Sequence, residues 1–306
     1  MRRVAVATSI SAPSSGPIPL SLLVGTFLLV WTSAFAVAKL AIADCPPLLL
    51  LGFRFLAAGA LMFGLTAAAR ARWTLGLRDV VLFALLGIAN QAIYLGVGYV
   101  GLQFVSSGLA VLIFSSNPVI TAILAALVLG ERLTWAKSVG LVLGVAGVAF
   151  IVESRISAGT DHLLGIVLNV IATLSFVGGT ILFKRYAPKD GLWIGNAVQS
   201  LAAGVALLPF SLTFENLADV VPSWRLLAAF VYLVLVVSVL AYLLWFRILA
   251  VSGATAASSC YFLMPPVGML FGWLLLGERV AFSDLLGIIP VVLGIYLVTR
   301  PTSVHH

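Results

Sequence analysis

The sequence predicts an all-α integral membrane protein with ten transmembrane helices, arranged as two inverted five-helix repeats with both termini in the cytoplasm. Hydrophobic residues make up 62% of the 306 residues and charged residues 9%, and the mean hydropathy is +1.19. A water-soluble domain does not carry such a balance, so the solvent of this chain is lipid. The letters Leu-Gly-Glu-Arg at 129–132 also return at 276–279, which indicates an internal repeat.

The repeat extends well beyond these four letters. An offset of 147 residues aligns the two copies without a gap and superposes Pro118 on Pro265, Gly140 on Gly287 and Gly147 on Gly294. The repeated unit is therefore about half the chain. We predict a first repeat at 18–152, an external linker at 153–162 and a second repeat at 163–299. A disordered cytoplasmic tail is expected at 1–17 and a short cytoplasmic tail at 300–306.

Each repeat contains five apolar runs of about 20 residues, long enough to cross roughly 30 Å of hydrocarbon. These runs lie at 19–41, 46–69, 79–98, 103–129 and 134–152, and then at 163–186, 190–212, 225–249, 253–276 and 281–299. The connections contain Pro46, Pro47, Pro188 and Pro222, and Gly130 and Gly277 end the fourth and ninth runs. Proline and glycine stop helices, which supports these boundaries.

The basic residues predict the orientation. With the amino terminus inside, twelve of the 17 lysines and arginines fall on the cytoplasmic side: Arg2, Arg3, Arg70, Arg72, Arg78, Arg132, Lys137, Lys184, Arg185, Lys189, Arg247 and Arg300. Arg155, Arg225 and Arg279 fall in external connections, whereas Lys39 and Arg54 lie in the outer halves of helices. This asymmetry fits the positive-inside rule.

An odd number of helices per repeat inverts the second copy. The Glu131-Arg132 pair of the first copy and the Glu278-Arg279 pair of the second are therefore expected to hold helix ends at opposite faces of the membrane.

The sequence lacks the residues that several classes of function require. The net charge of +7 is dispersed between apolar runs, which argues against a nucleic-acid surface. Cys45 and Cys260 fall in different segments and give neither a disulfide framework nor metal-ligand spacing. The zinc-hydrolase, serine-hydrolase and phosphate-loop motifs are absent, so we expect no enzyme, no cofactor, no metal and no ATP-driven pump. The expected partners are membrane lipid and a small-molecule substrate.

Short motifs follow one another in a characteristic order. The first span contains Trp31-Thr32-Ser33-Ala34-Phe35 followed by Lys39, the second contains Arg54-Phe55, and Asn117-Pro118 precedes the first Leu-Gly-Glu-Arg. In this order the motifs resemble those of the EamA-type branch of the drug/metabolite transporter superfamily, over nearly the whole chain. The second copy departs from the pattern, with Met264-Pro265-Pro266 in place of Asn117-Pro118. The resemblance implies a bacterial inner-membrane exporter of small metabolites, most similar to exporters of aromatic or neutral amino acids.

An inverted repeat has a mechanical consequence. Two packings of the halves can be nearly equal in energy, one open to each side, which predicts alternating access with the substrate between the repeats near the midplane. Pro118, Pro265 and Pro266 remove backbone donors inside the fourth and ninth spans. They are predicted to kink these helices, either permanently or as hinges beside the cavity.

Polar residues at mid-membrane depth are candidates for the substrate site, because each costs free energy without a partner or a wet cavity. Asn90 and Tyr94 are four residues apart and share one helix face, with Gln91 beside them. Further candidates are Ser115 and Asn117 before the first proline, and Tyr242 and Tyr261 in the second copy. The alternative is helix–helix hydrogen bonding, worth about 0.6 to 2 kcal/mol per bond.

Aromatic residues complete the predicted site. Trp31 and Phe35 share a helix face by their spacing. Together with Tyr94, Tyr99 and Tyr261 they could form a box for an aromatic or bulky aliphatic side chain.

Arg54 is the candidate cation of the site. It lies about eight residues into the second span, roughly 10 Å below the outer surface at 1.5 Å per residue. Two interpretations are open. The guanidinium meets a substrate carboxylate, or it extends outward to the interface or a helix end.

The acidic residues indicate how transport is driven. All ten fall in connections or at helix ends, whereas proton-coupled carriers commonly use a membrane-embedded carboxylate or histidine. We therefore predict facilitated transport, by a functional monomer because both halves share one chain. Two other interpretations stay open: a carrier for nucleosides or for neutral or cationic drugs, and a receptor or scaffold that transports nothing.

Overall fold

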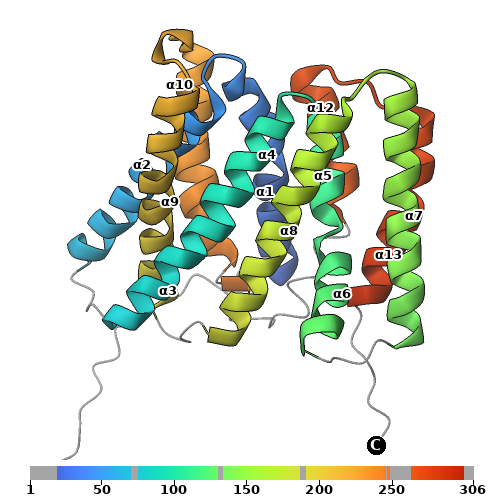
Figure 1. The fold of residues 1–306 in the computed structure, drawn as a ribbon, viewed down its shortest axis with the longest axis horizontal. Coiled ribbons are helices and arrows are strands. Elements are labelled where there is room, and N and C mark those ends of the chain that lie inside the picture. Colours follow the sequence, from blue (N-terminus) through green and yellow to red (C-terminus); the bar gives the residue numbers. More distant parts are fainter. Residues whose placement is uncertain are drawn as a thin grey trace, which may run out of the picture.

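The computed structural model describes residues 19–69, 75–129, 134–186, 191–245, 247–248 and 263–299. Within these ranges the chain is a bundle of helices without a strand (Figure 1). Eight helical segments are long and apolar enough to cross a membrane, and two shorter apolar helices, Met264–Leu276 and Phe282–Val298, follow them. The all-helical class predicted from composition is confirmed. The ninth predicted span begins at 253, in residues outside the described ranges.

In the first repeat the helices follow the predicted spans, two of which are divided. The first and second spans are α1 (Leu20–Ile42) and α2 (Pro47–Ala68). The third contains α3 (Leu77–Gly87), a π-helical segment η1 (Ile88–Ile93) and α4 (Tyr94–Leu102), and the fourth contains α5 (Ser107–Ser115) and α6 (Asn117–Leu129). The last helix, α7 (Trp135–Ser157), runs past the predicted boundary at 152.

The second repeat begins with α8 (Leu163–Tyr186) and α9 (Leu192–Phe214). A short 3-10 helix, η2 (Leu217–Asp219), and α10 (Trp224–Val231) lead into a second π-helical segment, η3 (Tyr232–Leu240). The apolar span that contains η3 extends to Trp245. After residues outside the described ranges follow α12 (Met264–Leu276) and α13 (Phe282–Thr299).

Corresponding helices of the two repeats run in opposite directions through the bundle. In Figure 1, α1 rises from the lower end, where α13 also ends, whereas α8 descends from the upper end. The connections that follow α1, α4, α7, α9 and α12 all lie at the upper end. The helices are therefore inverted between the repeats, and the upper end is the one that the basic residues predict to be external.

The two π-helical segments occupy equivalent positions in the repeats. The offset of 147 that aligns the Leu-Gly-Glu-Arg motifs places Ile88–Ile93 on residues 235–240, inside Tyr232–Leu240. Such turns are rare and frequently lie at functional sites. The two repeats therefore share a π-helical segment as well as the Leu-Gly-Glu-Arg motif and the aligned glycines.

The prolines of the fourth and ninth spans begin helices. The fourth span is divided at Ser116, and Pro118 lies in the first turn of α6. The carbonyl of Ser116 accepts the N–H of Val119 at 2.9 Å, which starts α6. Pro265 and Pro266 likewise lie in the first turn of α12. A first-turn proline gives up a donor that has no helical partner. All three prolines therefore stand at helix starts, and their role as kinks or hinges stays a prediction.

Glycines allow α7 and α13 to cross at close range. A Cβ atom on Gly140 would lie 2.7 Å from the carbonyl oxygen of Gly294, and one on Gly147 would lie 2.8 Å from that of Gly287. Any larger residue would push the two backbones apart. These are the glycines that the repeat aligns, so their role is to join the last helices of the two repeats.

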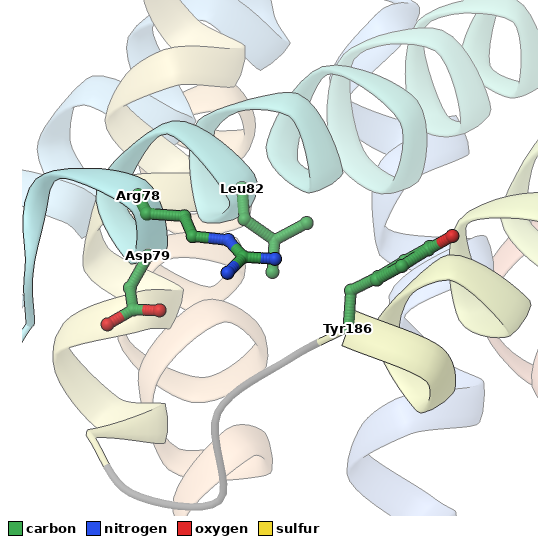
Figure 2. Close-up of a pocket in the computed structure, with 4 residues that line it drawn as sticks. All are labelled: Arg78, Asp79, Leu82 and Tyr186. Carbon is green, nitrogen blue, oxygen red and sulfur yellow. The ribbon is translucent and has the colours of Figure 1, made fainter.

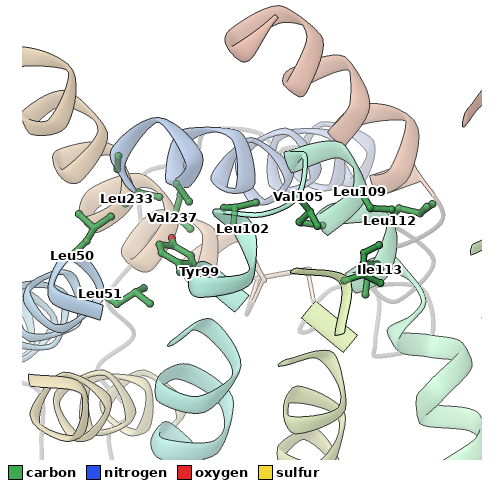
Figure 3. Close-up of a cluster of buried hydrophobic side chains, with 14 of the residues drawn as sticks. Leu50, Leu51, Tyr99, Leu102, Val105, Leu109, Leu112, Ile113, Leu233 and Val237 are labelled. Atoms are coloured by element: carbon green, nitrogen blue, oxygen red, sulfur yellow. The ribbon is translucent and has the colours of Figure 1, made fainter. Parts of the chain in front are cut away.

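The largest cluster of buried apolar side chains spans both repeats (Figure 3). It contains Leu51 of α2, Tyr99 of α4, Leu109 of α5 and Leu233 of η3. Burial of these side chains fixes the first-repeat helices α2, α4 and α5 against η3 of the second.

Candidate functional site

A cavity of about 60 Å³ lies between the two repeats. The first repeat contributes residues of α1, α2, η1 and α4, and the second contributes residues of α8, α9 and η3. Both π-helical segments line it, η1 through Asn90 and Gln91 and η3 through Val237 and Ser238. A water molecule needs about 10–15 Å³ of such space, so the cavity has room for a few waters. A bulkier substrate enters only when the surrounding helices separate.

Arg54 of α2 is the charged residue that lines this cavity among the described residues, and it is only 4% exposed. Its Nε donates to Ser238 Oγ at 3.0 Å, and its Nη1 donates to Tyr99 Oη at 2.6 Å. Figure 3 shows the Tyr99 ring beside Val237 of η3. The ion pairs between described residues do not include Arg54. Its guanidinium is therefore held by hydroxyl groups without a carboxylate.

Gln91 of η1 contributes a buried amide to the wall of the same cavity. Its Nε2 donates to Asn196 Oδ1 at 3.3 Å, and Asn196 Nδ2 donates to Met62 Sδ at 3.4 Å. Gln91 Oε1 and Asn90 Oδ1 are buried and have no hydrogen-bond partner in the described parts of the chain. A buried acceptor left unpaired costs about 1–3 kcal/mol. These two oxygens are therefore suited to a donor on a ligand.

Aromatic rings from both repeats form much of the remaining wall. The rings of Trp31 and Tyr242 lie edge to face at 5.8 Å between centroids, and those of Tyr94 and Phe176 lie 5.0 Å apart. Each pair joins a first-repeat helix to a second-repeat helix. Ring faces and edges of this kind suit an aromatic or apolar side chain.

The structure brings together seven of the ten predicted substrate residues. These are Trp31, Phe35, Arg54, Asn90, Tyr94, Tyr99 and Tyr242. Ser115 and Asn117 do not line the cavity: Ser115 Oγ donates to the carbonyl of Val111 at 2.7 Å, and Asn117 Oδ1 accepts from Thr121 Oγ1 at 2.9 Å. Both therefore bond within their own helices. Tyr261 lies outside the described residues.

Five polar or aromatic residues of the wall were not among the predicted substrate residues: Phe55, Gln91, Phe176, Ser200 and Ser238. The repeat offset carries a signal for one of them, because Ser238 aligns with Gln91 at 147 residues. Ser200 and Phe176 reach the cavity through packing between helices that are distant in the sequence, and no local pattern marks them.

Arg155 is a second buried arginine, at the upper end of the bundle. Its Nε donates to Asp284 Oδ1 at 2.9 Å, and its Nη1 donates to Asp161 Oδ2 at 3.1 Å and to Ser106 Oγ at 2.6 Å. The Arg155 side chain is 8% exposed and both carboxylates are 0% exposed. One guanidinium thus joins α7, the connection to α8, α13 and the start of α5.

Carboxylates at the same end cap helices across the repeats. Glu278, in the second Leu-Gly-Glu-Arg copy, accepts the N–H groups of Ser107 at 2.7 Å and Gly108 at 3.2 Å, and it pairs with Lys39 at 3.5 Å. Glu215 caps the first turn of α2 in the same way. Carboxylates satisfy the free donors of a helix start and interact with its dipole. The second motif copy thus anchors the start of α5, and residues 130–132 of the first copy lie outside the described ranges.

The connection between α1 and α2 contains another paired carboxylate, Asp44. Arg225 Nε donates to Asp44 Oδ2 at 2.9 Å, and Ser223 Oγ donates to the same oxygen at 2.5 Å. The bond from Arg225, followed by that from Ser223, holds the pKa of Asp44 below its usual value. Burial, followed by the charge of Glu215, raises the pKa of the neighbouring Cys45 thiol to about 11. That thiol therefore stays protonated at neutral pH.

A separate open pocket of about 260 Å³ lies at the lower end, between the start of α3 and the end of α8 (Figure 2). The Arg78 side chain extends toward the end of α8, the Tyr186 ring points away from Arg78, and the Asp79 carboxylate accepts the N–H of Gly76 at 3.2 Å. The pocket shares no lining residue with the central cavity. It is an open recess of the predicted cytoplasmic face.

The sequence profile of the EamA-like transporter family matches residues 19–153 and 163–300, which are the two repeats. An S-adenosylmethionine/S-adenosylhomocysteine transporter of Chlamydia muridarum is 31% identical over 281 residues, covering 88% of each chain. The uncharacterized transporter YoaV of Bacillus subtilis is 24% identical and covers 89% of this chain and 93% of YoaV. The uncharacterized inner membrane transporter YedA of Escherichia coli K12 is 28% identical and covers 89% and 87%.

The fold agrees with these matches. A solved crystal structure superposes with a TM-score of 0.66 at 20% sequence identity, covering 91% of this chain and 95% of the other, so the fold is shared. Eight apolar helices long enough to span a bilayer and relatives named as transporters identify a multi-pass inner-membrane transporter. With a profile match over both repeats, the chain belongs to the EamA-like transporter family.

Proposed function

We propose that this protein exports amino acids with aromatic or bulky neutral side chains by alternating access, with the substrate carboxylate bound by Arg54. One observation carries the proposal: Arg54 is buried at the cavity, and its described partners are hydroxyl groups. A buried charge without an opposite charge is costly, above all within a membrane. A substrate carboxylate supplies the opposite charge and can accept two parallel N–H bonds from a guanidinium.

The aromatic walls support the side-chain part of the proposal. The rings of Trp31, Tyr94 and Phe176 offer contact area to an apolar or aromatic group, as ligand sites usually do. The name of the chlamydial relative points to the same head group, because S-adenosylmethionine contains an α-amino acid. An adenosylated amino acid is therefore the second candidate substrate.

The contacts between repeats support alternating access. Glu278, after α12, is tied to Lys39 of α1 and to the start of α5, and these contacts lie at the predicted outer end. Because the cavity has room for only a few waters, a substrate needs the repeats to separate at one end at a time. Breaking the Glu278 contacts opens the proposed outer path.

Liposome counterflow tests this function. Purified protein is reconstituted with one unlabelled compound inside, and uptake of the same labelled compound is measured in turn for phenylalanine, tryptophan, leucine, S-adenosylmethionine, a nucleoside and a cationic drug. Aromatic and bulky neutral amino acids are expected to exchange. Exchange of the nucleoside or the drug without exchange of any amino acid would contradict the substrate class, and exchange of no compound would favour a receptor or scaffold.

A matched pair of variants ties this result to the cavity. Arg54→Gln is expected to abolish counterflow because the carboxylate loses its cation. Arg247→Gln makes the same change at an exposed position that does not line the cavity, so it is expected to transport like the wild type. Equal transport by both variants would remove Arg54 from the site.

We further propose facilitated transport by a functional monomer. The described acidic residues lie in connections or near helix ends, as Asp44, Asp161 and Glu278 illustrate, and none lines the cavity. Substrate gradients are therefore expected to drive no proton flux in sealed liposomes that contain a pH-sensitive dye. A substrate-dependent pH change would show proton coupling instead.

A further inference from the structure

We infer that η1 supplies a second pole of the substrate site, in which the amide oxygens of Gln91 and Asn90 bind the ammonium group of a zwitterionic substrate. The inference rests on the proposed function, in which Arg54 binds the carboxylate. The substrate class is then defined by both charged groups of a free amino acid, the carboxylate and the ammonium group. Acids without an ammonium group, and amines without a carboxylate, each lose one pole.

The hydrogen bonds of Gln91 fix the end of its amide that remains available. Its NH₂ group donates to Asn196 Oδ1, and the NH₂ group of Asn196 is in turn directed at Met62 Sδ. The thioether is an acceptor only, so this chain of donors has one direction. The unpaired atom of Gln91 is therefore an oxygen, in a residue that is 3% exposed and lines the cavity. An acceptor at this position selects a donor, and an ammonium group is the strongest donor that an amino acid carries.

Asn90, the preceding residue of η1, supplies a second unpaired amide oxygen. Its Oδ1 is buried without a partner in the described chain. A Cβ atom on Gly179 of α8 would lie 1.8 Å from this oxygen, so the glycine makes room for the Asn90 amide. Ser175 Oγ of α8 also donates to the carbonyl of Ala89 at 2.9 Å, which fixes η1 against α8. The acceptor pole is thus held by contacts from the second repeat.

The two π-helical segments place different side chains at equivalent positions of the two repeats, and each side chain serves a different pole of the site. Gln91 of η1 and Ser238 of η3 are related by the repeat offset of 147 residues, and both line the cavity. Ser238 Oγ accepts from Arg54 Nε at 3.0 Å and so holds the cation that binds the carboxylate. Gln91 provides the acceptor for the ammonium. A symmetric scaffold therefore contains an asymmetric site that orients a zwitterion.

Ligand analogues separate the two poles. Binding of phenylalanine, 3-phenylpropanoate and 2-phenylethylamine to the purified full-length protein is measured by isothermal titration calorimetry. Gln91→Leu is expected to lower the affinity for phenylalanine and for 2-phenylethylamine by about tenfold or more, because a hydrogen bond to a charged group is lost. Its affinity for 3-phenylpropanoate is expected to stay within about twofold of that of the wild type. Arg54→Gln is expected to lower the affinity for phenylalanine and for 3-phenylpropanoate and to leave the affinity for 2-phenylethylamine unchanged.

Controls separate this outcome from misfolding. Gln103→Leu makes the same change at an exposed position at the end of α4 and is expected to bind all three compounds like the wild type. Gln91→Glu keeps the side-chain size and adds a negative charge, so it is expected to bind 2-phenylethylamine more tightly than the wild type. Size-exclusion profiles report whether each variant is folded. If Gln91→Leu does not fold, the binding measurements with Gln91→Glu test the inference instead.

The outcomes distinguish the second pole from the proposed function. If Gln91→Leu weakens the acid and the amine equally, or weakens neither, the ammonium site at η1 is wrong even though phenylalanine still depends on Arg54. A Gln91→Glu variant that binds the amine no better than the wild type gives the same conclusion. If the wild type binds no amino acid, the proposed function fails and the inference fails with it.

Discussion

Two buried arginines, Arg155 and Arg54, face opposite electrostatic surroundings in one membrane protein. Arg155 is bonded to two carboxylates, Asp161 and Asp284, which are themselves fully buried. Arg54 is bonded to the hydroxyl groups of Ser238 and Tyr99. Arg155 joins four segments at the end of the bundle, whereas Arg54 lines a cavity between the repeats.

The difference separates a structural cation from a ligand-binding one. The charge of Arg155 is balanced within the protein, so its role is complete in the folded chain. The charge of Arg54 meets two hydroxyl groups and the ring of Phe55, whose centroid lies 5.4 Å from the guanidinium carbon, but no carboxylate among the described residues. An anionic group on a substrate therefore improves its surroundings. Burial alone does not distinguish the two residues, because both are nearly inaccessible. The partners of each guanidinium do.

The largest expected effect is on stability, at Arg155. Arg155→Met leaves two carboxylates buried without a cation, and breaking a buried pair in this way costs about 3–5 kcal/mol. Thermal unfolding in detergent, followed by tryptophan fluorescence, measures the loss. The triple variant Arg155→Met, Asp161→Asn and Asp284→Asn removes the uncompensated charges and is expected to recover most of it. An Arg155→Met protein that unfolds at the wild-type temperature would contradict the structural role.

Arg54 is expected to show the opposite pattern, with a large effect on substrate and a small one on stability. Arg54→Gln removes a charge that has no described carboxylate partner, so the unfolding midpoint stays close to that of the wild type. Substrate affinity falls by about tenfold or more because a charge-assisted hydrogen bond is lost. Calorimetric titration with phenylalanine and thermal unfolding on the same preparation check both expectations. Arg54→Lys keeps the charge but loses the planar fork and is expected to bind with intermediate affinity.

Glu278 and Lys39 allow the same comparison for a partly exposed pair. Lys39→Met removes an ion pair whose side chains are 28% and 15% exposed, which is expected to cost under about 1 kcal/mol, together with the hydrogen bond that Lys39 Nζ donates to the Val105 carbonyl. Glu278→Ala leaves the N–H groups of Ser107 and Gly108 without their acceptor and is expected to cost about 1–3 kcal/mol. Unfolding midpoints and amide hydrogen exchange at the start of α5 measure the two. A larger loss for Lys39→Met would show that the contacts of Lys39, and not the helix cap, fix this end.

The smallest effect is a pH dependence at Asp44. Its folded pKa is held below 3.8, the value of the free side chain, by Arg225 and then by Ser223. The group therefore contributes stability above pH 3.8, and this contribution is lost as the pH falls through the folded pKa. The difference in unfolding midpoint between the wild type and Arg225→Met is expected to be constant near neutral pH and to shrink below that value. A difference that grows on acidification would have the wrong sign.

The helices and their repetition could be predicted from the sequence because each follows from a local property. Apolar length predicts a spanning helix, and the aligned glycines and Leu-Gly-Glu-Arg copies predict two related halves. The division of the fourth span at Ser116 was not predicted, because Pro118 in a sequence can equally kink a helix or begin one. The π-helical segments carry no sequence signal of their own, since Tyr232–Leu240 is an ordinary apolar run.

The site was predicted in its residue types but not in its pairings. Polar and aromatic residues at mid-membrane depth are costly there, which is why Asn90, Tyr94 and Arg54 could be named from the sequence. The partners of Arg54 could not be, because Tyr99 is 45 positions away and Ser238 is 184 positions away along the chain. Such contacts depend on how the helices pack, and that packing decides whether an arginine binds a ligand or extends outward to the interface.

A double-mutant comparison between protein and ligand tests the central claim most directly. Phenylalanine and phenylalaninamide differ by the carboxylate alone, and their affinities are measured by calorimetry for the wild type and for Arg54→Gln. The wild type is expected to prefer the acid by about tenfold or more, and Arg54→Gln is expected to bind both ligands equally, because the coupling resides in the pair of guanidinium and carboxylate. An undiminished preference for the acid in Arg54→Gln would show that Arg54 does not bind the carboxylate.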